Sequence, residues 1–188
     1  MSGRIRLFGY ITLAFFLIED VNAQKIADAS LKVGDIVLDG KLNELDWGSA
    51  EVISDFTQFS PNPGDASTQR TELRILFDDE AIYVGARMFD TAPDSILMQY
   101  SQRDQIRNSD EFGIMFSPYN DGINGVAFAT TPAGILVDMN VSPSGMDPNW
   151  DAVWDVMTVV DEYGWTAEFK IPWSALRFAK MEKGDDVV

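Results

Sequence analysis

Apolar and polar residues alternate along most of this chain, a pattern that predicts short β-strands. The clearest case is residues 109–140, where Phe112, Ile114 and Phe116 occupy every second position. A loop rich in Asn, Asp and Gly follows at 118–125, and a Pro-Ala-Gly turn separates the next two apolar runs. Such turns between alternating runs are typical of hairpins. The pattern predicts a three-stranded meander with strands at 112–116, 126–131 and 135–139.

Further alternating runs lie on both sides of this meander. Residues 71–90 read as a hairpin around an acidic turn at 78–80, and strands are predicted at 150–160 and 165–171. Near-helical spacing of Leu42, Leu45 and Trp47 predicts one helical turn within 42–50, with Trp47 as a buried anchor. The weaker predictions are strands at 36–38 and 52–59, a short helix at 94–100 and a helical turn at 173–176.

Many short strands without a long helical period predict an all-β fold, specifically an antiparallel β-sandwich. Residues 24–188 show neither an internal repeat nor a linker, so we expect one domain. A further strand pattern begins in the last residues, 185–188. We therefore expect the sandwich to be truncated here and to continue beyond Val188.

Residues 1–23 have the pattern of a secretory signal peptide. Arg4 and Arg6 precede an apolar run at 7–18 that is too short to span a bilayer. The residues at 21–23 fit a cleavage site after Ala23. The sequence therefore predicts export to the periplasm, the outer membrane or the extracellular space.

Composition excludes several functions. The chain of 188 residues has no cysteine and no histidine, so thiol catalysis and every Ser-His or Cys-His pair are ruled out. Its net charge of −16 disfavours nucleic acid as a partner. Asp110 and Glu111 are adjacent and face opposite sides of a strand, so they are a poor acid–base pair for glycoside hydrolysis.

Four segments together resemble carbohydrate-binding module family 9. They are IVLDGKLNELDW at 36–47, LRILFDDEAIYVGARMFD at 73–90, SDEFGIMF at 109–116 and GWTAEFKIPWSAL at 164–176. With FSPYNDGINGVAF at 116–128 and WDAVW at 150–154, the chain is most similar to a domain of unknown function found at the amino terminus of large bacterial outer-membrane proteins. In those proteins a carboxy-terminal β-barrel follows.

The resemblance implies a jelly-roll-like β-sandwich that binds sugars, is often attached to xylan-degrading enzymes and often holds structural calcium. In this family two tryptophan rings clamp the terminal sugar. The loop that matches the first ring, 103–109, contains no aromatic residue, and Arg107 stands about where the ring is expected. The second ring lies in the part of the family domain beyond Val188.

Sugar sites combine aromatic faces with amide, carboxylate and guanidinium groups. The amide-rich segment 99–108 is therefore a plausible binding rim, and mere connection is the alternative. The candidate carbohydrate-binding residues are Tyr100, Arg103, Arg107, Asn108, Trp150 and Trp154. Core packing is the alternative for both tryptophans, and it is favoured for Trp154 because that residue lies mid-strand.

Oxygen-bearing residues in the YNDGIN loop could hold calcium. The candidate ligands are Asn120, Asp121 and Asn124, together with Asp138. The alternative is a solvated turn built from ordinary turn-forming residues.

Three functions follow from these observations. The first is an exported domain, not catalytic by itself, that binds a poly- or oligosaccharide in carbohydrate catabolism, as an accessory to a glycoside hydrolase. The second is a structural or gating domain of an outer-membrane β-barrel protein, linked covalently to the barrel and carrying a degenerate sugar site. The third, a haem-binding relative, is disfavoured because only Met or Lys remain as axial ligands.

Overall fold

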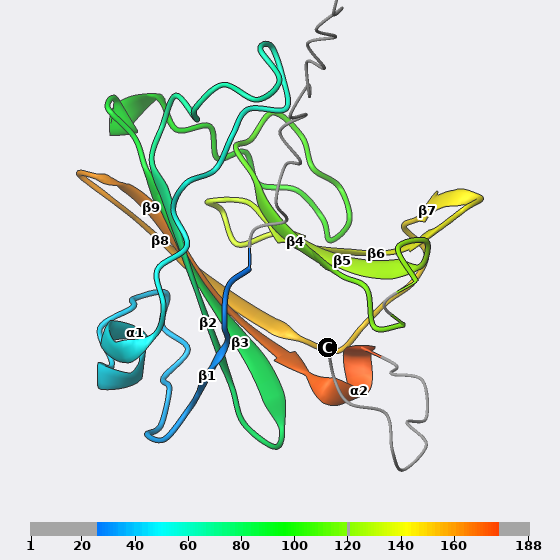
Figure 1. The fold of residues 1–188 in the computed structure, drawn as a ribbon. Coiled ribbons are helices and arrows are strands. Elements are labelled where there is room, and N and C mark those ends of the chain that lie inside the picture. The colour runs from blue at the N-terminus through cyan, green and yellow to red at the C-terminus, as the bar shows by residue number, and fades with distance from the viewer. Residues whose placement is uncertain (1–25, 120, 177–188) are drawn as a thin grey trace, which may run out of the picture.

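The computed structural model describes residues 26–119 and 121–176, whose strands form two sheets (Figure 1). One sheet has the strand order β1-β2-β3-β9-β8 and the other the order β4-β5-β6-β7. The first comprises β1 (Ser30–Leu31), β2 (Thr71–Phe77), β3 (Ala81–Phe89), β8 (Asp155–Asp161) and β9 (Gly164–Pro172). The second comprises β4 (Phe112–Phe116), β5 (Gly125–Thr130), β6 (Leu136–Ser142) and β7 (Gly145–Asp147).

All pairings between these strands are antiparallel except that of β1 with β2. The predicted hairpin is confirmed: β2 pairs with β3 so that Leu73 faces Ala86 and Ile75 faces Val84. The predicted meander is also confirmed as β4, β5 and β6. Burial alternates residue by residue in β4, as the sequence predicts, whereas residues 81–86 of β3 are all buried because apolar clusters cover both faces of that strand.

The two sheets pack face to face around an aromatic core. Phe169 of β9 stacks on Trp154 with ring centres 5.6 Å apart and planes 5° apart. Phe112 of β4 meets the same Phe169 edge-on at 5.9 Å, and Phe128 of β5 meets Trp154 at 5.2 Å. These contacts join both sheets, so the predicted all-β sandwich is confirmed.

A second apolar cluster covers the opposite face of the five-stranded sheet. It contains Trp47 from the short helix α1 (Leu45–Ser49), together with Leu76 and Tyr83 from the sheet. Figure 1 shows α1 on the side of this sheet that faces away from the four-stranded sheet. The prediction that Trp47 is a buried anchor is confirmed, since it is 1% exposed.

Some predicted elements differ from those observed. The strand predicted at 150–160 begins only at Asp155, and residues 36–38 and 52–59 form no strand beyond isolated bridges at Ile53 and Thr57. The helix predicted at 94–100 is a single 3-10 turn, η1 (Pro93–Ser95), whereas the predicted turn after Pro172 is the helix α2 (Trp173–Leu176).

The predicted signal peptide, residues 1–23, and the last residues, 177–188, lie outside the described residues. Within the described ranges, no helix has the length and apolar character needed to cross a membrane.

Candidate functional site

The segment between η1 and β4 forms a loop whose two ends are joined. Met98 and Ser109 form an antiparallel bridge, and the backbone N–H of Asp110 donates to the carbonyl of Leu97 at 2.8 Å. The N–H of Gln99 donates to the Ser109 hydroxyl at 2.7 Å. These bonds close the loop formed by residues 99–108 at its base.

This loop carries an open hollow of about 430 Å³. The residues that line it are Tyr100, Ser101, Gln102, Gln105 and Arg107. Tyr100 is 74% exposed, so most of its ring is available to a ligand. The structure thus brings together two predicted residues, Tyr100 and Arg107, and adds the side-chain amides of Gln102 and Gln105. The amide-rich composition of the segment was the signal for these two glutamines.

The loop is fixed to the body of the domain through Arg103. Its guanidinium pairs with the carboxylate of Asp138 on β6 and donates to the carbonyl of Ala152 at 2.8 Å. Asp138 is fully buried, and its second carboxylate oxygen accepts from the N–H of Ala152 at 2.5 Å. Asp104 also binds β6, because its carboxylate accepts the backbone N–H of Asp138 at 3.1 Å. Arg103 is therefore a structural anchor of the loop.

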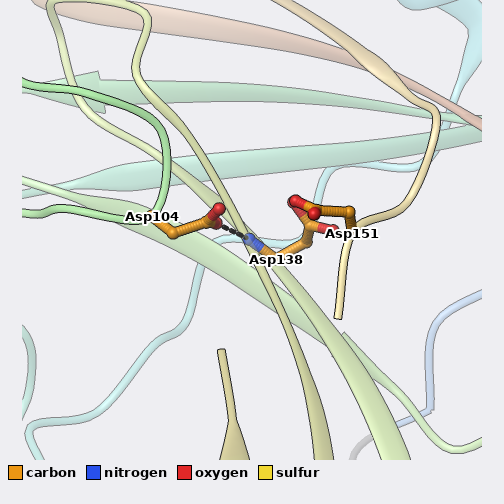
Figure 2. Close-up of side chains that lie close together, drawn as sticks. All are labelled: Asp104, Asp138 and Asp151. Atoms are coloured by element: carbon orange, nitrogen blue, oxygen red, sulfur yellow. Dashed lines mark hydrogen bonds between the residues drawn. The ribbon is translucent and has the colours of Figure 1, made fainter. Parts of the chain in front are cut away.

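Three carboxylates gather at this anchor, as Figure 2 shows. Asp104, Asp138 and Asp151 each place one oxygen within 4.8 Å of the others. The Nε of Arg103 lies 3.5 Å from Asp104 and 3.4 Å from Asp151. The guanidinium is thus shared by all three carboxylates and offsets part of their repulsion, and the cluster joins the loop, β6 and the segment before β8.

The structure does not place the two tryptophans in this hollow. Trp154 is only 3% exposed and is stacked on Phe169, which agrees with the core packing that was favoured for this residue. Trp150 is half-buried and meets Phe128 edge-on, with ring centres 6.0 Å apart. Asn108 is exposed but does not line the hollow.

Comparison with solved structures identifies the fold. A family 9 carbohydrate-binding module from Caldicellulosiruptor kristjanssonii in complex with glucose superposes with a TM-score of 0.57 at 16% identity, covering 82% of this chain and 72% of that one. The fold is that of the family 9 carbohydrate-binding modules. A family 9 module from the same organism in complex with cellotriose gives a TM-score of 0.55 at 17% identity, covering 79% of this chain and 68% of that one. A candidate carbohydrate-binding protein from Bacteroides uniformis gives 0.58 at 14% identity, with 84% and 77% coverage.

The family 9 likeness is one of structure rather than of sequence. No protein-family model matches this chain, and no curated protein matches it.

Of the predicted calcium ligands that the structure describes, Asp121 and Asn124 lie together and Asp138 lies apart from them. Both carboxylate oxygens of Asp121 accept bonds within its own turn, from the N–H groups of Ile123 and Asn124 and from the Asn124 side-chain amide. These bonds lower the pKa of Asp121, the backbone and side-chain bonds from Asn124 most of all. Asp138 pairs with Phe128, three residues along β5 from Gly125, where the loop ends. Asn120 lies outside the described residues. Calcium binding at the loop stays a prediction.

Proposed function

We propose that this domain binds carbohydrate in the hollow on the 99–108 loop. The observation that carries the proposal is the exposed ring of Tyr100 beside two side-chain amides and the guanidinium of Arg107. The structural neighbours support it, since two of them are family 9 modules in complex with glucose and cellotriose.

The chemistry of the hollow suits a sugar ring. The face of Tyr100 can pack against the C–H surface of a pyranose, because an aromatic ring offers a large apolar contact. The amides of Gln102 and Gln105 each supply donors and an acceptor, and Arg107 supplies donors only. A hollow of about 430 Å³ that is open on one side accommodates part of a saccharide and leaves the remainder of the chain in solvent.

The hollow has one aromatic residue in its lining, Tyr100, which implies weak binding at this site. A single ring contact and a few exposed hydrogen bonds each contribute about 0.5–1.5 kcal/mol. Their sum predicts a binding free energy of about −4 kcal/mol, which corresponds to a dissociation constant near the millimolar range. This range is usual for a domain that adds to the affinity of a larger assembly, where linkage of weak sites raises the overall affinity.

Calorimetric titration of the full chain with glucose, cellotriose and xylo-oligosaccharides tests the proposal. We expect Tyr100→Ala to abolish the measured heat. The matched control is Tyr163→Ala, since Tyr163 is 61% exposed in the turn between β8 and β9 and does not line the hollow. Heat that survives in Tyr100→Ala, or its absence from the unmodified chain with every saccharide, contradicts the proposal.

The setting of this activity is also part of the proposal. The pattern at residues 1–23 supports action after export, in carbohydrate catabolism and as a non-catalytic accessory to a glycoside hydrolase. The alternative is a structural or gating domain linked to an outer-membrane β-barrel, which the segments at 116–128 and 150–154 and the missing tryptophan in the loop favour. Sequencing the gene downstream of Val188 separates the two: a glycosidase domain supports the first and a barrel supports the second.

A further inference from the structure

A second hollow lies on the outer face of the five-stranded sheet. Its volume is about 340 Å³, within the usual range for small-ligand sites. Its lining includes Arg74 of β2, Arg87 of β3, Asp161 of β8 and Thr166 of β9, and none of the residues of the 99–108 loop. It is therefore a separate site from the one on the loop.

One wall of this hollow is held in place by a buried carboxylate. The Oε2 of Glu168 on β9 accepts the backbone N–H groups of Asp39 and Gly40, each at 3.0 Å, and its Oε1 accepts the indole N–H of Trp47 at 3.2 Å. Gly85 of β3 makes room for this wall. A Cβ at that position would lie 2.7 Å from Leu42 and 3.0 Å from Trp47. The segment that closes the hollow is thus fixed against the sheet.

The charged groups of the hollow differ in how many of their hydrogen-bonding groups are already engaged. Arg87 binds both oxygens of Asp161, at 2.6 and 2.9 Å, and the Thr166 hydroxyl at 2.7 Å. Glu72 accepts from Arg74 at 3.1 Å and is also paired with Arg70. Among the residues that line the hollow, Lys41, Arg74 and Arg87 are positive and Glu72 and Asp161 are negative, and Lys41 is also paired with Asp39 at 3.6 Å. The charges around the hollow therefore balance, so the ligand is indicated by the N–H donors that remain unused and not by a net positive charge.

The hydrogen-bond donors and acceptors that remain unused in the hollow indicate which chemical groups a ligand must carry. Arg74 has five N–H donors, and the bond to Glu72 engages one of its nitrogens. The carboxylates of Glu72 and Asp161 already accept bonds from arginines. An incoming group therefore meets more donors than acceptors, and a carboxylate fits the guanidinium fork best. Thr166 and the exposed Asn43 add groups that pair with hydroxyls.

We propose that this outer-face hollow binds a sugar acid, with the carboxylate of a uronic acid held by Arg74. The site is independent of the hollow on the 99–108 loop and takes a different class of ligand. A domain with both sites would contact a neutral sugar at the loop and an acidic sugar on the outer face of the sheet.

Titration of the full chain with glucuronate, followed by calorimetry and by tryptophan fluorescence, tests this proposal, because Trp47 lines the hollow. In the Tyr100→Ala chain, where the loop hollow is disabled, we expect glucuronate to bind, whereas glucose, which lacks the carboxylate, and acetate, which lacks the ring, bind at least about tenfold more weakly. Arg74→Gln is expected to weaken glucuronate binding about tenfold or more. Arg74→Lys keeps the ion pair with Glu72 but not the fork, so its loss is expected to be smaller.

The control is Arg107→Gln, which changes an arginine of the loop hollow. It is expected to leave glucuronate binding unchanged, as is Tyr100→Ala, so failure of this proposal and failure of the loop site are distinguishable. Melting temperatures of the Arg74 variants show whether the fold is retained. Equal binding of glucose and glucuronate in Tyr100→Ala, no glucuronate binding, or unchanged binding in folded Arg74→Gln overturns the proposal.

Discussion

Replacing Arg103 by methionine removes the partner of a fully buried carboxylate. Asp138 is 0% exposed, and Arg103 is paired with it across the boundary between the loop and β6. Methionine keeps much of the length of the side chain but has no charge and no N–H donors. Within the described part of the chain, the Asp138 carboxylate would then accept one hydrogen bond, from the backbone N–H of Ala152 at 2.5 Å.

The expected loss follows from the geometry. Removing one partner of a buried ion pair costs about 3–5 kcal/mol. Here the Arg103 side chain is 37% exposed, so water can reach Asp138 once the guanidinium is gone. We therefore expect a loss of about 2–3 kcal/mol in the free energy of unfolding. For a domain of this size that corresponds to a fall of about 4–12 °C in the melting temperature.

Urea unfolding followed by tryptophan fluorescence measures this loss. The matched control is Arg107→Met, since Arg107 is an exposed arginine of the same loop and its replacement is expected to cost less than about 0.5 kcal/mol. Adding Asp138→Asn to Arg103→Met is expected to recover part of the stability, because the buried charge is removed. Equal losses in Arg103→Met and Arg107→Met, or no recovery in the double variant, would refute the role given to this pair.

Three further predictions test other parts of the structure. Gly164→Ala is expected to lower the free energy of unfolding by more than about 3 kcal/mol, because a Cβ there would lie 2.0 Å from the carbonyl oxygen of Met88. Gly145→Ala, also at positive φ but in open space, is expected to lower it by about 1 kcal/mol. Equal losses of the two variants in thermal unfolding contradict the clash. Burial raises the pKa of Glu168 above 4.5 despite its hydrogen bonds, so the folded state holds the proton more tightly and stability falls as pH rises from 4.5 through the folded pKa; Glu168→Gln is expected to remove this slope, and an unchanged slope contradicts the assignment. For the predicted calcium site we expect calorimetric heat and a raised melting temperature that Asp121→Asn removes, and a titration with neither excludes it.

Alternation of apolar residues predicted the strands whose backbones pair with other strands, but it failed where side chains replace that pairing. Ala152, Trp154 and Val156 are all buried, as alternation requires, yet the strand begins only at Asp155. The N–H of Ala152 donates to Asp138 and its carbonyl accepts from Arg103. A segment can thus show strand periodicity while its backbone bonds go to side chains far away in the sequence.

The candidate site was predictable as a segment but not in the roles of its residues. The amide-rich composition of 99–108 indicated a rim, and the structure places Tyr100 and Arg107 together on it. Arg103 has the same chemistry as Arg107, and only the position of Asp138, 35 residues away, shows that it anchors the loop. The outer-face hollow depends on contacts between β2, β3, β8 and β9, which no local pattern in the sequence reveals.

An NMR titration of the full chain with cellotriose is the most direct test of whether the 99–108 loop binds a saccharide. The side-chain amide signals of Gln102 and Gln105, together with the backbone signals around Tyr100 and Arg107, are predicted to shift with one common saturation curve. Signals of Tyr163 and of the outer-face hollow are predicted to stay in place. Cellotriose that shifts no signal of the loop, or that shifts the outer-face hollow instead, contradicts the claim.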